Sequence, residues 1–348
     1  MENRKIQKVG HSTLTVSLPS RWVNEVGLKQ GDTIFFSTEK DNSLKIMPTG
    51  STNPKKDTSK CTINSDLCDD GGMLERVIVG CYIVGRDAIT IASSKKITTG
   101  HIAETRVAVQ KLMGLDIVEE TSNKIVLQCF IDPTKFPLPT LLKRLFVIVS
   151  TMQTEAMEAF VKFDIEIAEE VIKREDEADR MYWLIVRLLH LVQEDASILD
   201  ELGLDEPTLV LGYRIIAKYF ETIADCSRNM ARNVIEIDKC KDKIKKPVIK
   251  IISEMGDLSL NMCQKSMECF FSGDIRCVNR VIQARADVDV KESKLMEIIE
   301  LGNFDVFLAT HLRCFSWNLR RIAEHGASIA HIVINRSLKK SSKICKVD

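Results

Sequence analysis

The sequence predicts a multidomain protein with a small β-rich module, a small α+β unit and an all-α domain of two three-helix repeats. Short apolar runs alternate with polar residues up to about Pro48, as they do in strands. From Pro137 onward, apolar residues instead recur with helical spacing almost to the end of the chain. We therefore expect a module, a linker, the α+β unit and the two repeats at 1–48, 49–72, 73–133, 137–240 and 241–340.

The composition is typical of a folded protein and limits how the protein could bind nucleic acid. The 348 residues are 45% hydrophobic and 28% charged, and Lys plus Arg equals Asp plus Glu at 49 each. Because the net charge is zero, any nucleic-acid contact must come from a local basic patch. No apolar run approaches the roughly 20 residues that a membrane span needs. The 11 cysteines include no CxxC pair, and with no signal-like start they predict reduced thiols in a cytoplasmic protein.

Residues 1–48 predict short strands around one brief helix. Strand-like runs lie near Val16, at Phe35–Phe36 and at Leu44–Ile46. The helix is expected between Pro19 and Gly27.

Four basic residues cluster before and just after the first predicted strand: Arg4, Lys5, Lys8 and Arg21. In so small a fold, several cations on one face can contact phosphates or enter a groove of DNA. The alternative is an ordinary solvated face, which composition alone favours slightly.

Residues 49–72 hold Ser, Thr, Asn, Lys and Asp with few apolar residues, which is typical of a linker. The α+β unit that follows is expected to contain strands and one helix. The strands are predicted at Val77–Val84, Ala88–Ala92, Asp116–Glu119 and Ile125–Ile131, and the helix at His101–Met113.

Glycine and proline are confined to junctions in the helical half. This predicts helices at 138–163, 165–195, 208–237, 246–271, 275–301 and 305–338. The helices form two copies of three. At an offset of 110, Asp164-Ile165 recurs as Asp274-Ile275, and at an offset of 99, Arg214 recurs as Arg313. Because charged positions match as well as apolar ones, the pattern indicates a duplication.

The first copy carries two pairs of carboxylates at i, i+4. Glu175 and Asp179 lie on its second helix, and Glu221 and Asp225 lie on its third. This spacing places both members of a pair on one helix face. Two such helices side by side would offer four oxygen ligands to a hard or borderline cation. The alternative is a solvated acidic face.

The second copy is not equivalent to the first. At the positions of the first copy's four carboxylates it holds Arg285, Asp289, Arg320 and Glu324. Two guanidinium groups replace two ligands, so we expect arginine–carboxylate pairs there and weaker or absent metal binding.

No motif in the chain indicates catalysis. The sequence contains no Ser or Cys nucleophile motif, glycine-rich phosphate loop or HExxH pattern. His325 and His331 lie near Glu324 on the last predicted helix, but we expect surface or interhelical histidines there. The protein is therefore predicted not to be an enzyme.

The start of the chain resembles the AbrB-type (SpoVT/AbrB) DNA-binding domain. Three pieces carry the resemblance in order: 4–10 (RKIQKVG), 14–19 (LTVSLP) and 27–32 (GLKQGD). The resemblance implies a swapped-hairpin barrel in which two chains interlace, and hence a homodimer or higher oligomer through this domain. It also implies DNA contacts from the basic residues around the first strand, here Arg4, Lys5, Lys8 and Arg21.

The helical half resembles the PhoU family of phosphate-uptake regulators, which contain two three-helix repeats. Glu175–Asp179 and Glu221–Asp225 match that family's E/DxxxD motifs, and Arg321–His325 is similar to the corresponding segment of the second repeat. These motifs can hold multinuclear iron or zinc clusters, so the resemblance implies such a cluster in the first repeat. Arg285 and Arg320 depart from the pattern and weaken the case for a second cluster.

Together the two resemblances cover about three quarters of the chain and imply an archaeal type of phosphate-uptake regulator. The implied function is regulation of phosphate uptake and homeostasis, with a helical sensor or docking domain coupled to a DNA-binding dimer. The implied protein partner is a phosphate transporter ATPase or a signalling kinase. The alternative is an adaptor that docks on such a partner without binding DNA. The unit at 73–133 stays unassigned, as a small-molecule-sensing or dimerisation module.

Overall fold

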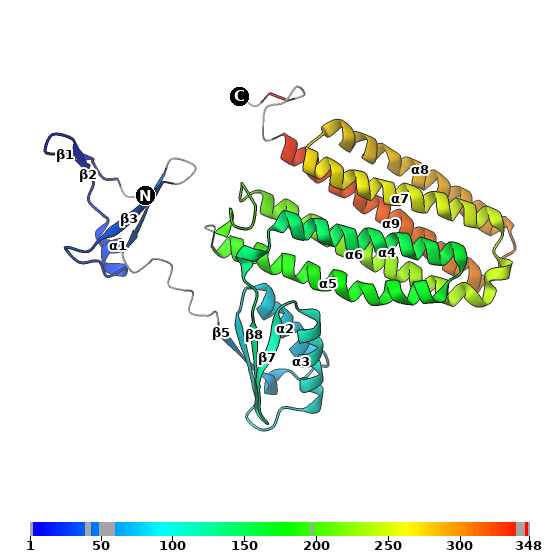
Figure 1. Cartoon of the computed structure of the whole chain (residues 1–348), viewed down its shortest axis with the longest axis horizontal. Coiled ribbons are helices and arrows are strands. Elements are labelled where there is room, and N and C mark those ends of the chain that lie inside the picture. The colour runs from blue at the N-terminus through cyan, green and yellow to red at the C-terminus, as the bar shows by residue number, and fades with distance from the viewer. Residues whose placement is uncertain (1–2, 39–42, 49–59, 196–197, 339–344, 347–348) are drawn as a thin grey trace. The chain divides into compact units, whose positions relative to one another are not determined.

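The computed structural model of the chain describes residues 3–38, 43–48, 60–195, 198–338 and 345–346 (Figure 1). The chain divides into two compact units, residues 1–59 and 60–348. Residues 49–59 of the predicted linker lie outside the described residues. None of the described helices has both the length and the apolar character that crossing a membrane requires.

The N-terminal unit contains two hairpins and a short helix, which confirms the predicted β-rich module. Strands β1 (Gln7–Val9) and β2 (Thr13–Thr15) pair antiparallel, and so do β3 (Ile34–Thr38) and β4 (Leu44–Pro48). Helix α1 (Ser20–Glu25) lies between the hairpins in the sequence.

Large apolar side chains of this unit are exposed. No described side chain of the unit is buried, and Ile6, Leu14, Phe36 and Leu44 expose between 57% and 68% of their surface. Isolated two-stranded hairpins are marginal in water because they bury too little apolar area. The described residues of this unit therefore form no core of their own.

The α+β part begins the second unit and is a sheet covered on one face by two helices (Figure 1). Its main elements are β5 (Lys60–Asn64), α2 (Met73–Ile83), β6 (Ala88–Ala92), α3 (Thr99–Lys111), β7 (Leu115–Glu120) and β8 (Lys124–Cys129). The strand order is β5-β6-β8-β7, with β5 and β6 parallel and the other neighbours antiparallel. Ile89, Ile91, Ile125 and Leu127 of the central strands are buried against the helices.

Two predictions for this part are wrong. The linker is predicted to extend to residue 72, but Lys60–Asn64 forms β5, because pairing with β6 gives this mostly polar run a place in the sheet. The run Val77–Val84 is predicted as a strand, but it lies almost entirely in α2. A short apolar run fits a strand or a buried helix equally well, and here Leu74, Ile78 and Tyr82, one turn apart, are fully buried.

The helical part confirms the predicted repeats, with each helix end within one residue of its expected place. The helices are α4 (Leu138–Lys162), α5 (Ile165–Glu194), α6 (Leu209–Ile237), α7 (Lys246–Ser272), α8 (Ile275–Leu301) and α9 (Val306–Ser337). The repeated aspartates are helix caps: Asp164 accepts a hydrogen bond from the backbone N–H of Ile167, and Asp274 accepts one from that of Arg276.

The two repeats meet along α6 and α9, with a further contact between α4 and α7. The ring of Tyr219 stacks on that of His325 with centroids 5.2 Å apart. Further along, Asn233 Oδ1 lies 2.7 Å from His311 Nδ1. These pairs show that α6 and α9 run antiparallel, and they confirm His325 as an interhelical histidine, whose pKa is lowered mainly by burial.

Arg187 of α5 fixes the α+β part to the first repeat. Its side chain is 1% exposed. Nη1 donates hydrogen bonds to the carbonyl oxygens of Tyr82 at 2.5 Å and Arg86 at 3.0 Å, and Nη2 donates to the carboxylate of Asp87 at 2.6 Å. Because a buried charge is costly unless it is paired and hydrogen-bonded, these contacts hold the two parts in one arrangement.

The prediction that all the cysteines are reduced is wrong at one place. Cys269, near the end of α7, and Cys277, in the first turn of α8, form a disulfide. Gly273, in the left-handed conformation with φ of 70°, reverses the chain between them and brings their Cα atoms to 5.8 Å. The other described cysteines are free.

Candidate functional site: the carboxylate faces of the two repeats

The structure brings together the four carboxylates predicted in the first repeat. Helices α5 and α6 are neighbours, so Glu175 and Asp179 on α5 face Glu221 and Asp225 on α6. The pKa of Asp179 is raised to about 7, first by burial and then by the charges of the other three carboxylates. Asp179 therefore lies close enough to the other three carboxylates to feel their charges.

Arg228 of α6 joins this face and was missed by the sequence reasoning. Its Nη1 donates a hydrogen bond to Glu175, and its Nη2 donates to Asp225 at 2.7 Å. Burial raises the pKa of Glu175, and the neighbouring Arg228 opposes that rise. The signal for Arg228 was present, because it lies three residues after Asp225 and seven after Glu221, on the same helix face.

Lysine side chains border the same face. Lys218 Nζ lies 2.5 Å from a carboxylate oxygen of Glu221. Lys111, on α3 of the α+β part, pairs with Glu75 at 2.8 Å, and its pKa is raised first by that hydrogen bond and further by the charges of Asp179 and Asp176. The α+β part therefore borders the first carboxylate face.

The residues as arranged do not fit an iron or zinc cluster. Such ions need ligand atoms converging at about 2.0–2.2 Å, whereas Glu175 and Asp225 are bound to the guanidinium of Arg228 and Glu221 to Lys218. No group of three or more His, Cys, Asp or Glu in the described chain is placed to hold a metal ion. The cluster in the first repeat stays a prediction.

The second repeat forms the arginine–carboxylate pairs that the sequence predicts. Arg285 Nη2 lies 2.9 Å from Glu324 on α9, and Arg320 Nε lies 3.2 Å from Asp289 on α8. Arg320 also reaches Glu292 at 3.4 Å. Two arginines thus link α8 to α9.

The basic residues predicted to contact DNA lie in the N-terminal unit. Arg4 and Lys5 precede β1, Lys8 lies within it, and all three are exposed. Arg21 in α1 is also exposed and pairs with Glu25 at 2.9 Å. Three of the four cations therefore lie on or just before one hairpin strand.

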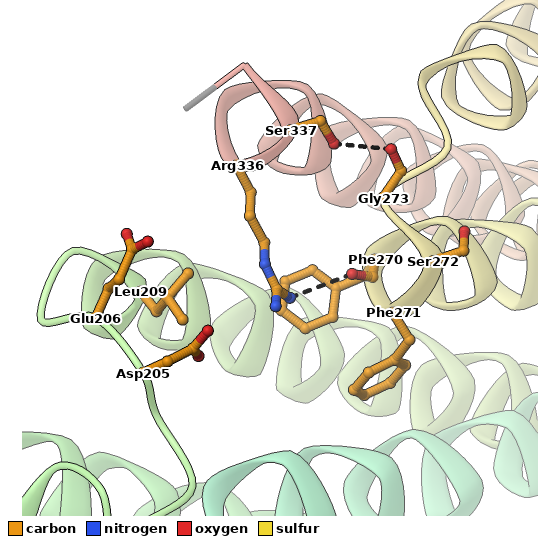
Figure 2. A pocket seen from close by; sticks show the side chains of 9 residues that line it. All are labelled: Asp205, Glu206, Leu209, Phe270, Phe271, Ser272, Gly273, Arg336 and Ser337. Carbon is orange, nitrogen blue, oxygen red and sulfur yellow. Dashed lines mark hydrogen bonds between the residues drawn. The ribbon is translucent and has the colours of Figure 1, made fainter. Parts of the chain in front are cut away.

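A pocket of about 220 Å³ lies at one end of the helical part, where α6 begins and α7 and α9 end. Figure 2 shows Asp205 and Glu206 on the α6 side and the rings of Phe270 and Phe271 on the α7 side. Arg336 lies over the Phe270 ring and donates to its carbonyl oxygen at 3.3 Å. Nothing in the sequence pattern signals this pocket, because its lining comes from three distant segments.

Comparisons with known proteins agree with this division of the chain. The PhoU domain model matches residues 142–234 and 252–333, and the model of the MazE antitoxin family, described as antidote–toxin recognition, matches residues 7–53. The crystal structure of PhoU from Pseudomonas aeruginosa is 18% identical, with a TM-score of 0.50 over 57% of this chain and 93% of that one. PhoU of the phosphate transport system from Streptococcus pneumoniae is 18% identical over 61% and 96%, with a TM-score of 0.46. No curated protein matches the chain.

Proposed function

The chain belongs to the PhoU family, whose domain model matches both helical repeats, and on this premise we propose that it is a cytoplasmic, non-enzymatic regulator of phosphate uptake that binds DNA as a dimer. One observation carries the proposal: a single chain joins both PhoU repeats to an N-terminal segment that matches the MazE family. The helical part would dock on a phosphate transporter ATPase or a signalling kinase.

Exposed cations support the DNA part of the proposal. Arg4, Lys5, Lys8 and Arg21 are all exposed, so their positive charges are accessible to phosphates. DNA affinity gained through such contacts falls steeply with salt.

Exposed apolar residues support the dimer. Val16 exposes 51% of its surface, and Leu18 and Ile34 are only partly buried. A second copy interlaced with the first would cover these residues and supply the missing core. Light scattering at micromolar concentration should give at least a dimer, and a monomer would rule the interlaced barrel out.

The Arg187 contacts support coupling between the parts. They fix the α+β part to α5, and this part begins with β5, the first strand after the N-terminal unit. A signal received by the helices then reaches the chain next to the DNA-binding unit.

The test is recovery of DNA on the purified full chain at moderate salt, with and without phosphate. Replacing Arg4 and Lys8 with alanine should weaken binding to all sequences. It should also lower the salt slope by about one unit per lost phosphate contact. An affinity unchanged at low salt would favour the adaptor, which docks on the transporter or kinase without contacting DNA.

A further inference from the structure

Arg228 lies where the two carboxylate-bearing helices of the first repeat meet. It bonds to Glu175 on α5 and to Asp225 on α6 through different guanidinium nitrogens. One side chain therefore links both helices, as a metal ion shared by the same carboxylates would. The Arg228 side chain is 24% exposed and that of Glu175 11%, so water screens this pair only in part.

The carboxylates need a cation at this position. Four such groups on one face repel one another, and a partly buried site strengthens the repulsion. The charges of the other three carboxylates raise the pKa of Asp179, whereas the charge of Arg228 lowers it. Arg228 acts in the same favourable sense on Glu175. It thus opposes the repulsion on both carboxylates of α5.

The second repeat balances its charges from different sequence positions. In the alignment of the repeats Arg228 corresponds to Ala327, so neither arginine of the second face is its counterpart. Among the described residues, each face nevertheless has two cations in direct ion pairs with its carboxylates. They are Arg228 and Lys218 in the first repeat and Arg285 and Arg320 in the second. The charge balance recurs although the cationic positions do not.

We infer that Arg228 is the resident cation of the first repeat and that its guanidinium closes the carboxylate face to metal ions. Removing this side chain leaves Glu175, Asp179 and Asp225 without their shared counter-charge, so a divalent ion can then bind among them. The inference goes beyond the proposed function and does not rest on it, because it concerns metal content and not DNA.

The experiment compares the full-length chain with the variants Arg228→Ala and Arg228→Gln. Iron and zinc in the purified proteins are measured by mass spectrometry. Binding of Mn²⁺ is then followed by electron paramagnetic resonance, because Mn²⁺ prefers carboxylate oxygens to the free thiols of this chain. We expect only background metal and no Mn²⁺ on the unchanged chain, and about one Mn²⁺ per chain in both variants.

Two controls locate the ion. Arg174→Ala removes a partly buried arginine on the neighbouring helix α5. Arg174 pairs with Glu155 at 3.1 Å and not with the carboxylate face, so this variant should bind no Mn²⁺. Adding Asp179→Asn and Asp225→Asn to Arg228→Ala should abolish the gained Mn²⁺.

Two results would overturn the inference. The first is stoichiometric iron or zinc on the unchanged chain that is lost when Asp179 and Asp225 are replaced with asparagine, because a metal ion then takes the place assigned to Arg228. The second is an Arg228 variant that is folded by circular dichroism but gains no Mn²⁺. Arg228→Gln keeps part of the side-chain volume and an amide N–H donor without the charge, so it provides the test if Arg228→Ala does not fold.

Discussion

The two repeats share one arrangement of helices but differ in how deeply their charged faces are buried. In the first, the side chains of Arg228 and Glu175 are 24% and 11% exposed. In the second, those of Arg285 and Asp289 are 43% and 44% exposed. The duplicated fold fixes where charges from neighbouring helices meet, but it does not fix which position supplies the cation. The same residue change should therefore cost more in the first repeat.

The repeats differ in a second way, because the α+β part is docked on the first. Its buried anchor is Arg187, and Lys111 brings a further positive charge close to Asp179. The first face is therefore enclosed by more of the protein than the second.

The largest effect is expected from Arg187→Ala. It removes a buried guanidinium that donates hydrogen bonds to the carbonyl oxygens of Tyr82 and Arg86 and to the carboxylate of Asp87. Breaking a buried, hydrogen-bonded charge pair typically costs about 3–5 kcal/mol. Urea unfolding measures the loss, with Arg180→Ala, an exposed arginine of the same helix, as control. A loss no larger than that of the control would show that the α+β part does not depend on this anchor.

A smaller effect is expected from Arg228→Ala in metal-free buffer. The change leaves the buried Glu175 without its counter-charge, which should lower the free energy of unfolding by about 2 kcal/mol. Arg285→Ala in the second repeat should cost less than about 1 kcal/mol, because water screens that more exposed pair. Thermal unfolding of the two variants side by side tests the contrast. Equal losses would mean that the difference in burial has no energetic consequence.

The third effect is a pH dependence at Asp179. Its pKa is raised from 3.8 to about 7 in the folded chain, so the folded state holds this proton more tightly than the unfolded state does. Asp179 therefore lowers stability progressively as pH rises through this interval. Asp179→Asn removes the charge, and its stability relative to the unchanged chain should be greater at pH 8 than at pH 5 by about 1 kcal/mol or more.

The matched substitution in the second repeat is Asp289→Asn. It breaks the ion pair of Asp289 with Arg320 at 3.2 Å, so it should destabilise the chain at both pH values. A difference between Asp179→Asn and the unchanged chain that does not vary with pH would contradict the raised pKa.

Local sequence pattern was enough to predict the six helices of the repeats and the shared carboxylate face. Helix periodicity, caps such as Asp164, and i, i+4 spacing all act within a few turns of one helix. The duplication then placed Arg285 and Arg320 among carboxylates, which the structure confirms.

Two of the missed features, helix α2 and the role of Arg187, depend on contacts between distant segments. The apolar run that forms α2 is compatible with a strand or a helix, and only its packing on the sheet selects the helix. Arg187 is one arginine among several on α5, and only the docked α+β part shows its role. Arg228 could have been found by extending the face that carries Glu221 and Asp225 by one turn.

The buried Arg187 also sets a limit on how the chain can be divided into fragments. A fragment that starts near Leu138 keeps all six helices of the repeats but loses Tyr82, Arg86 and Asp87, the partners of Arg187. The guanidinium of Arg187 is then exposed next to apolar residues such as Trp183 and Leu191. Such a fragment should be prone to self-association, since an uncovered apolar surface attracts other copies. A piece that starts at Lys60 keeps every partner of Arg187. A fragment designed to express the helical half should therefore begin before β5 and not at α4.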